Sequence, residues 1–172
     1  MIKLIGAVLI LFAGTMIGWQ QAAGYSARPR QIRQLIQALQ RLETEINYGY
    51  TLLPEAIGRS GIQLPEPVCA ILRDASDLSS SAEGRPFAEC WEQAVKSNWP
   101  ATAMKNNEQS ALLRLGSTLG ISDREDQVKH LQLAVQQLRA EEDAAREEQA
   151  RYEKMSRSLG VLVAVLVVIL IV

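Results

Sequence analysis

The chain has 172 residues, of which 48% are apolar, and its formal net charge is −1. A chain of this length predicts one domain with appendages. The charge is close to zero and no lysine- and arginine-rich block is interleaved with aromatic residues, so the sequence offers no basis for nucleic-acid binding. Aromatic residues make up only 5%, and the glycines cluster near the ends and in turns, which favours helices over a β-sandwich.

Cys69 and Cys90 are the two cysteines, and 21 positions separate them. They form no CxxC motif and have no neighbouring histidine, which rules out a zinc site. A disulfide between them is one alternative. Two isolated thiols are more typical of a reducing compartment, so we expect ordinary packed cysteines.

Residues 1–24 predict an N-terminal transmembrane helix. Residues 4–19 are apolar except for Thr15, and with their flanks they reach the roughly 20 residues that span a bilayer. The alternative is a cleaved signal peptide, since the apolar core is short and residues 22–24 are small. Basic residues that flank a transmembrane helix stay on the cytoplasmic side of the membrane. Arg28, Arg30 and Arg33 follow this segment, which predicts that its N-terminus lies outside.

Residues 25–140 predict an all-α cytoplasmic bundle of about six soluble helices, because apolar residues recur with the period of a helix. The helix-start signals are Pro29, Pro54, Pro65 or Pro67, Pro86, and Asn106 or Asn107. The stop signals are Gly49, Gly58 or Gly61, and Gly120, and the serine-rich residues 79–84 are predicted to form a loop. The predicted core positions are Ile32, Leu35, Ile36, Leu39, Leu42, Ile46, Val68, Ile71, Leu72, Ala75, Leu78, Phe87, Cys90, Trp91, Ala94, Val95, Ala111, Leu112, Leu115 and Leu119.

The last soluble helix is predicted to be long. Ser122 and Glu125 are spaced as a capping box, which predicts the helix start. The apolar stripe that follows consists of Val128, Leu131, Val135 and Leu138. Beyond it the same face becomes polar, so we expect packing to end near Leu138. No glycine or proline lies between Asp123 and Leu159, so an unbroken helix through the C-terminus would be about 75 Å long.

Residues 141–157 predict a charged helical stalk, because in residues 141–154 the only groups that could be buried are alanines and Tyr152. Pairs such as Glu142 and Arg146 stabilise a solvated helix by about 0.2–0.5 kcal/mol, and we expect such a helix here. Residues 158–172 predict a second transmembrane helix that continues the stalk. Its apolar part spans about 21 Å, less than the roughly 30 Å of a bilayer core unless Arg157 reaches the headgroups. The preceding basic residues place the stalk in the cytoplasm, in agreement with the first anchor.

Small residues recur at four-residue spacing in both apolar segments, as Gly14 and Gly18 in the first and Gly160 and Ala164 in the second. Such pairs let transmembrane helices approach one another closely. The alternative is that glycine and alanine are simply common in membrane helices. Both interpretations stay open.

The sequence contains no motif for catalysis or cofactor binding. GxxxxGK[ST], GxGxxG, HExxH and GxSxG are all absent. His130 is the single histidine and is matched with no serine or cysteine, so we expect a partly exposed bundle histidine rather than a catalytic base. Glu43 and Glu45 lie on different faces of a helix and form no carboxylate pair. The prediction is a non-enzymatic protein without metal or cofactor.

Several stretches together resemble one known family. They are residues 28–40 (RPRQIRQLIQALQ), 45–49 (EINYG), 53–57 (LPEAI) and 115–127 (LGSTLGISDREDQ), with His130 and Leu131 following. These stretches resemble the stage III sporulation protein AB family over essentially the whole chain, most loosely over residues 61–105. The family is similar in turn to the cytoplasmic domains of type II secretion and type IV pilus inner-membrane platform proteins. The shared feature is a helix, a glycine turn, a leucine and an alanine, as at Gly49, Leu52 and Ala56.

The resemblance implies a protein of the mother-cell membrane around the forespore of an endospore-forming bacterium, with its soluble domain facing the cytoplasm. It implies membership of the channel or secretion-like complex that connects the two cells. The implied partners are a secretion-type ATPase like stage III sporulation protein AA, other membrane subunits of the sporulation channel, and the lipid bilayer. Self-association into a homo-oligomer is left open. The resemblance carries over no catalytic residues.

We therefore expect a platform whose bundle docks the ATPase. The expected partner interface consists of Arg30, Arg33, Arg41, Asp123, Arg124 and Asp126. Capping, helix-dipole and positive-inside roles would also account for these charges. The alternative function is a membrane-anchored helical regulatory adaptor with no transport role. An integral-membrane enzyme would need a set of polar residues facing the membrane, which Thr15 alone does not supply.

Overall fold

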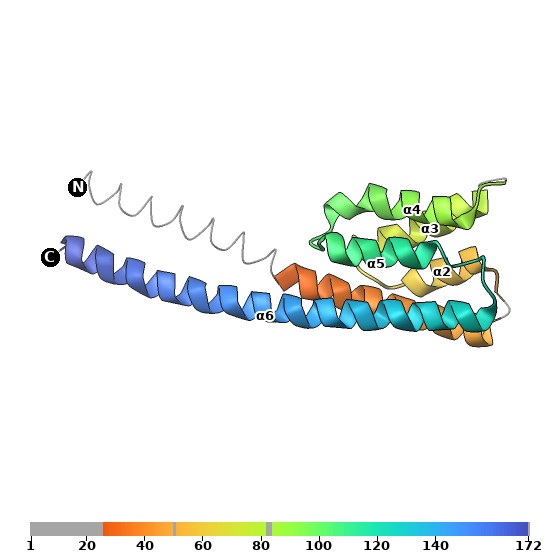
Figure 1. Ribbon diagram of the computed structural model, residues 1–172. Helices are drawn as coiled ribbons and strands as arrows, with labels where there is room; N and C mark the ends of the chain where they lie inside the picture. The colour runs from red at the N-terminus through yellow and green to blue at the C-terminus, as the bar shows by residue number, and fades with distance from the viewer. Residues whose placement is uncertain (1–25, 50, 82–83, 172) are drawn as a thin grey trace.

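The computed structural model describes residues 26–49, 51–81 and 84–171, and within them it leaves out the side chains of residues 153 and 156–171. Every regular element in the described residues is a helix, which confirms the predicted all-α class, and no strand occurs among them. The first helix covers residues 26–48 and is drawn unlabelled in red to orange in Figure 1. The elements that follow are α2 (Leu53–Gly61), α3 (Val68–Ser81), α4 (Phe87–Asn98), the 3-10 turn η1 (Trp99–Ala101), α5 (Asn106–Gly116) and α6 (Arg124–Ile171).

Proline and glycine signals account for several helix ends as predicted. Pro54 lies in the first turn of α2, and Pro86 directly precedes α4. The first helix ends at Gly49, whose amide donates to the Glu45 carbonyl at 2.7 Å. A Cβ atom at Gly49 would lie only 2.4 Å from the same carbonyl oxygen. The chain can therefore close this helix end only with a residue that has no side chain.

The predicted loop at residues 79–84 is wrong for its first three residues, which belong to α3. The Ser79 hydroxyl donates to the Ala75 carbonyl, and the Ser81 hydroxyl donates to the Asp77 carbonyl, both at 2.6 Å. These bonds satisfy the hydroxyls inside a helix, so serine composition alone does not end it.

The predicted ends of α5 are also wrong in detail. At its start the N-cap is Lys105 rather than an asparagine, and the Glu108 carboxylate accepts a hydrogen bond from the Lys105 amide at 2.9 Å. At its end α5 stops at Gly116 rather than Gly120. The Ser117 and Thr118 hydroxyls donate to carbonyls of the last turn, at 2.7 and 2.8 Å. Local side-chain bonds thus replace the expected caps.

The predicted capping box at Ser122 is displaced by one residue. The Asp123 carboxylate accepts from the Asp126 amide at 2.9 Å and caps α6. The Ser122 hydroxyl instead donates to the Thr118 carbonyl at 3.0 Å. An ionised carboxylate at a helix N-terminus also interacts favourably with the helix dipole, which favours Asp123 over the neighbouring serine.

The long helix is confirmed, since α6 runs unbroken for 48 residues, about 72 Å. It lies antiparallel to the first helix, because Gln132 bonds Glu43 near one end and Glu142 bonds Arg33 toward the other. We call the end where the first helix finishes and α6 begins the tip of the bundle. The opposite end, where the first helix begins and α6 continues past the other helices, is the base (Figure 1).

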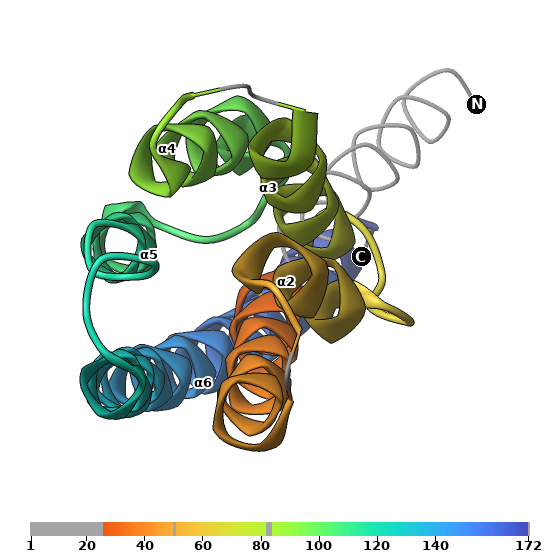
Figure 2. The same cartoon turned by 90° about the vertical axis from the view of Figure 1, so that its right-hand side faces the viewer.

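The helices α2 to α5 pack as successive neighbours, and α5 returns the chain to α6. Seen nearly end-on in Figure 2, they and the first helix surround a common interior. The predicted stripes are confirmed as its lining, with Ile46, Leu78 and Phe87 only partly buried at the edge. The exception is Val128, the first residue of the predicted stripe on α6, which is half-buried and not part of this core. The largest fully buried side chains are those of Ile32, Leu35, Leu39, Leu42, Ile57, Ile71, Leu72, Trp91, Leu112, Leu119, Leu131 and Leu138.

Trp91 joins α4 to α5 in this core. Its side chain is fully buried, and its indole N–H donates to the Leu112 carbonyl at 2.8 Å. The ring lies directly on Gly116, where a Cβ atom would come within 2.0 Å of the indole. A glycine at the end of α5 is therefore what allows the two helices to approach across the tryptophan.

Within the described residues, no helix combines the length and the hydropathy that a bilayer crossing requires. The predicted first anchor, residues 1–24, lies outside the described residues. The predicted second anchor, residues 158–172, falls mainly on the part of α6 for which only the backbone is described. Both anchors stay predictions.

Candidate partner interface and ion-pair network

Arg28 joins three helices at the base of the bundle. Its guanidinium lies 2.6 Å from the Glu108 carboxylate, 3.1 Å from that of Glu141 and 2.9 Å from that of Glu148. Arg28 belongs to the first helix, Glu108 to α5, and the other two to α6. The side chain of Glu108 is completely buried and that of Arg28 is 8% exposed. A five-donor guanidinium suits this position, because it can bond several carboxylates at once.

Lys105 completes this base network of Arg28, Lys105, Glu108, Glu141 and Glu148. Its ammonium contacts both carboxylate oxygens of Glu148, at 2.8 and 2.9 Å. The hydrogen bond from Lys105 is the main reason why the pKa of Glu148 lies below the usual glutamate range, and the charges of Lys105 and Arg28 add to the effect. Within the described residues no buried side-chain polar atom lacks a hydrogen-bond partner.

A second ion-pair group adjoins the base network on α6. Glu142 accepts from Arg33 of the first helix at 2.8 Å and from Arg146, one turn further along α6, at 2.7 Å. Arg146 also lies 3.9 Å from the exposed carboxylate of Asp143. The buried carboxylate of Glu142 is thus paired with two arginines, as a buried charge requires.

The expected solvated stalk is therefore wrong for its first half. Glu142 is 7% exposed and Ala145 is 2% exposed, so packing continues beyond Leu138. Every cross-helix partner of Glu141, Glu142 and Glu148 lies more than thirty positions away in the chain. From its sequence neighbours alone, a charged helical face is expected to contact solvent. In the folded protein, arginines and a lysine from distant parts of the chain pair with these glutamates.

Two of the three predicted interface arginines on the first helix already have partners within the protein. Arg33 pairs with Glu142, and Arg41 donates to the Ile62 carbonyl at 3.0 Å. Arg30, Arg33 and Arg41 are all exposed. The structure does not bring Arg30 and Arg33 to the other half of the predicted interface, because both lie toward the base while α6 begins at the tip.

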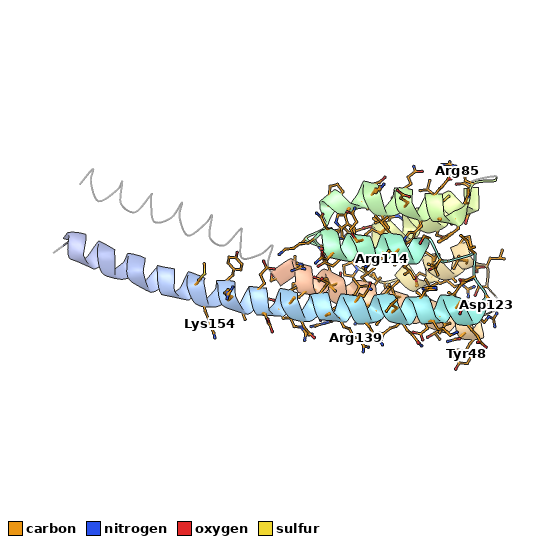
Figure 3. All side chains as sticks on the ribbon, in the orientation of Figure 1. Tyr48, Arg85, Arg114, Asp123, Arg139 and Lys154 are labelled. Carbon is orange, nitrogen blue, oxygen red and sulfur yellow. The ribbon has the colours of Figure 1, made fainter. Side chains whose placement is uncertain are left out.

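The predicted interface residues at the start of α6 lie together on the first turn of that helix. Asp123 is its cap, Asp126 pairs with Lys129 at 3.1 Å, and Arg124 is exposed between them. Asp123 is labelled at the tip in Figure 3. The cap and the ion pair explain two of these three residues structurally, and neither requires a partner.

The predicted small-residue pairs for membrane packing are not placed by the structure. Gly14 and Gly18 lie outside the described residues. Gly160 and Ala164 lie in residues 156–171, where the description is limited to the helical backbone. Their packing role stays a prediction.

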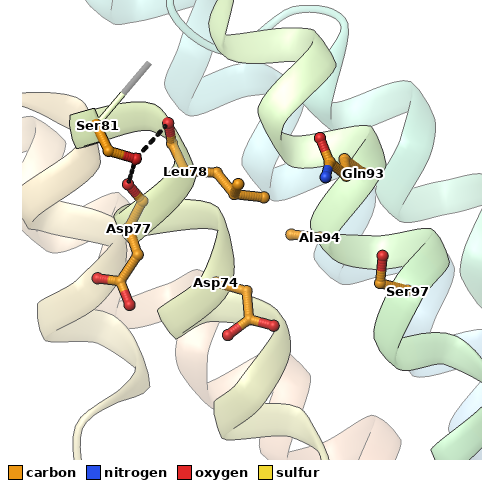
Figure 4. Close-up of a pocket in the computed structure, with 7 residues that line it drawn as sticks. All are labelled: Asp74, Asp77, Leu78, Ser81, Gln93, Ala94 and Ser97. Atoms are coloured by element: carbon orange, nitrogen blue, oxygen red, sulfur yellow. Dashed lines mark hydrogen bonds between the residues drawn. The ribbon is translucent and has the colours of Figure 1, made fainter.

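An open pocket lies between α3 and α4. Its lining residues are Asp74, Asp77, Leu78, Ser81, Gln93, Ala94 and Ser97 (Figure 4). The Asp74 carboxylate accepts a hydrogen bond from the Asn98 amide at 2.8 Å, and the Ser81 hydroxyl donates to backbone carbonyls of its own helix. The pocket contains no histidine or cysteine, and no group of three metal-binding side chains is found in the described part of the chain.

Sequence reasoning missed the base network as a whole. It treated Arg28 only as a positive-inside residue and the glutamates of α6 only as a solvated face. One local signal was available for Glu108, since a glutamate at the third position of a helix commonly reaches back to the N-cap amide. That signal predicts a cap but no arginine partner 80 positions away. His130 is exposed on α6, in line with its prediction as a bundle histidine.

Comparisons with known proteins agree on one family. A profile of the family described as stage III sporulation protein AB matches residues 3–172. The chain is 44% identical over 172 residues to stage III sporulation protein AB of Bacillus subtilis (strain 168), covering 99% of each chain. A solved structure of stage III sporulation protein AB is similar with a TM-score of 0.66 and 41% identity, covering 73% of this chain and 98% of that one.

Proposed function

Because the chain belongs to the stage III sporulation protein AB family, we propose that it is a non-enzymatic membrane platform of a sporulation channel or secretion-like complex. In this proposal the protein lies in the mother-cell membrane around the forespore. Residues 1–24 and 158–172 anchor it, and the bundle between them faces the cytoplasm. The bundle docks a secretion-type ATPase, and the anchors join other membrane subunits.

The observation that carries this proposal is the rigid connection between the bundle and α6. Arg28 follows the first predicted anchor by four residues and is bonded to Glu141 and Glu148, which precede the second. The start of the first helix and residues 141–148 of α6 are thus held together with α5 by buried or half-buried ion pairs. In this proposal, a force that acts on the bundle reaches α6 through these ion pairs, and α6 continues unbroken through Ile171.

The structure also shortens the part of α6 that can act as a stalk. Ion pairs to the bundle continue at least through Glu148, so a stalk that projects from the bundle can begin only after that residue. We place the stalk of the proposed platform there rather than from residue 141. The transmission proposal therefore depends on the helix continuing past Glu148, which it does through Ile171.

A co-purification experiment tests the docking part of the proposal. The tagged full-length chain, expressed in a sporulating host and extracted in mild detergent, should recover a P-loop ATPase together with other membrane subunits. A variant with the bundle unfolded by Trp91→Asp is the matched control and should recover no ATPase. Recovery of membrane subunits without any ATPase from the wild-type chain would overturn the docking proposal.

An insertion experiment tests the transmission part. Seven residues of glycine and serine inserted between Ala150 and Arg151 should interrupt α6 beyond Glu148 and abolish spore formation. Membrane insertion and ATPase recovery should be unchanged. The matched control is a seven-residue insertion of alanine, glutamate and lysine, which continues the helix for about two turns and should preserve more function. Normal spore yield with the glycine–serine insertion would contradict transmission through the helix.

A further inference from the structure

Three large apolar side chains are almost fully exposed at the tip of the bundle. Tyr48 is 83% exposed, Leu52 is 78% exposed and Ile121 is 77% exposed. These are the three highest values among the large apolar residues of the described chain. Scattered single exposures are ordinary on a protein surface, but a group of them at one place marks an interaction site.

The fold brings these three residues to the tip from separate parts of the chain. Tyr48 is the last residue of the first helix and is labelled at the tip in Figure 3. Leu52 directly precedes α2, and Ile121 lies in the turn between α5 and α6. These two loops touch, because a Cβ atom on Gly120 would lie 3.2 Å from the Leu53 side chain. We call Tyr48, Leu52 and Ile121 the tip patch.

The residues of the tip patch are not part of the hydrophobic core. The stripes of the helices that meet at the tip are buried, including the neighbours of two patch residues: Leu119 is fully buried, and Leu53 packs against the core. Each patch residue lies beside a helix end, where polar and turn-forming residues are usual. An apolar side chain that is exposed at such a position contacts water and gains no packing contacts in return. This points to a partner that covers the three side chains.

The charges around the tip patch indicate which kind of partner can bind there. Residues 45–59 and 121–129 contain five carboxylates and three cations, a net charge of −2. The carboxylates are those of Glu45, Glu55, Asp123, Glu125 and Asp126. An acidic rim is repelled by anionic lipid headgroups, and a second copy of the tip would bring the same negative charge.

We propose that the tip patch and its acidic rim are the docking surface for a partner protein that presents apolar side chains ringed by lysines and arginines. This inference rests on the proposed function, in which that partner is the ATPase. Three side chains cannot supply the roughly 800 Å² per partner of a stable interface, so the acidic rim takes part in it. The apolar centre provides affinity, and the rim provides orientation and a fast, salt-dependent association rate.

The first test measures binding of the purified ATPase to the full-length chain in detergent. The double variant L52S/I121S should reduce affinity at least tenfold, and Glu125→Lys should reduce the association rate several-fold at low salt and much less at high salt. The matched control is Leu133→Ser, because Leu133 is 52% exposed on α6 away from the patch. Thermal unfolding of all variants should match the wild type. Equal ATPase affinity for the double variant and the control would overturn the proposal for the tip while leaving ATPase docking intact.

The second test separates failure of the tip proposal from failure of the ATPase assignment. A photo-crosslinking amino acid at position 121 of the full-length chain, activated in sporulating cells, reports directly what the tip touches. A crosslink to a basic, apolar peptide of a protein other than an ATPase would support the tip surface and contradict the assignment of its partner. Crosslinks only to lipid, only to a second copy of this chain, or equal in yield to those from position 133 would overturn the tip proposal.

Discussion

Arg28 and Glu108 are 80 positions apart in the chain, yet the guanidinium of Arg28 approaches the carboxylate of Glu108 to 2.6 Å at a place where Glu108 has no contact with water. The same arginine bonds two carboxylates of α6. One side chain thus determines how the first helix, α5 and α6 meet at the base. A buried pair of this kind adds little net stability, but it penalises every arrangement in which either charge is buried alone.

The first prediction concerns that penalty. Arg28→Met should lower the free energy of unfolding by about 3–5 kcal/mol, because it leaves the Glu108 charge buried without its partner. The double variant R28M/E108Q should recover part of the loss. Urea denaturation of the full-length chain in detergent, followed by circular dichroism, measures both effects.

Arg146→Met is the control for this prediction. It removes an ion pair that is exposed on the arginine side, so its cost should be at most about 1 kcal/mol. If Arg28→Met proved no more destabilising than Arg146→Met, the base network would have no special role in stability.

The second prediction concerns the contact between Trp91 and Gly116. Gly116→Ala should destabilise the protein by about 1–3 kcal/mol, because the new methyl group would overlap a fully buried indole that cannot move aside. The control is Gly58→Ala, where the atoms met are the Ser76 hydroxyl at 2.8 Å and the Ser76 Cβ at 3.3 Å. The hydroxyl can rotate away and the Cβ has to give only slightly, so the control should cost clearly less than Gly116→Ala. Equal melting temperatures for the two variants would show that the α4–α5 contact is loose.

The third prediction is a pH dependence at Glu148. The folded protein holds the pKa of Glu148 below its ordinary value, chiefly through the hydrogen bond from Lys105. The resulting stability is therefore present above the ordinary glutamate pKa, about 4.3, and is lost as the pH falls through the lower folded pKa. Lys105→Met should lose less stability than the wild type on acidification, in paired urea titrations at neutral and acidic pH.

Lys96→Met is the matched control for this pH dependence, since Lys96 pairs with an exposed carboxylate one turn away. Its acid response should match that of the wild type. An unchanged acid response in Lys105→Met would mean that Glu148 gains nothing from the lysine.

The fourth prediction distinguishes the two candidate caps of α6. Asp123→Ala should destabilise the start of α6 by about 1 kcal/mol, whereas Ser122→Ala should cost much less, because only the Asp123 carboxylate bonds an amide of the first turn. Hydrogen exchange of the amides of residues 124–127 gives the measurement. Faster exchange in Ser122→Ala than in Asp123→Ala would restore the capping box that the sequence suggests.

The stripes on the helices could be predicted from the sequence because the period of a helix is a local property. Leu35, Leu39 and Leu42 on the first helix and Leu131 and Leu138 on α6 are all fully buried, as their spacing predicts. The unbroken course of α6 is equally local, since it depends on the absence of glycine and proline. Several helix ends lie a few residues from their predicted positions, because local hydrogen bonds decide where a helix ends and serine and aspartate can both bond the same amides.

The candidate sites could be predicted only in part, because they combine residues distant in the sequence. Asp123, Arg124 and Asp126 lie together at the start of α6, as their adjacency requires, and their role in an interface stays a prediction. Tyr48 and Leu52 come to the same end of the bundle from another helix and loop. Arg30 and Arg33 lie toward the other end of the bundle. Composition could not reveal this separation, because it depends on the antiparallel register of the first helix and α6.

The sequence by itself determined the helical class, the core-facing side of each helix and the unbroken length of α6, because each follows from interactions within about four residues. Only the tertiary structure decided where the charges of Glu141, Glu142 and Glu148 lie. From their local sequence they are expected on an exposed helical face, but in the folded bundle they neutralise Arg28, Arg33 and Lys105. The free energy of a charge depends on what surrounds it in space, and that is known only once the helices are packed.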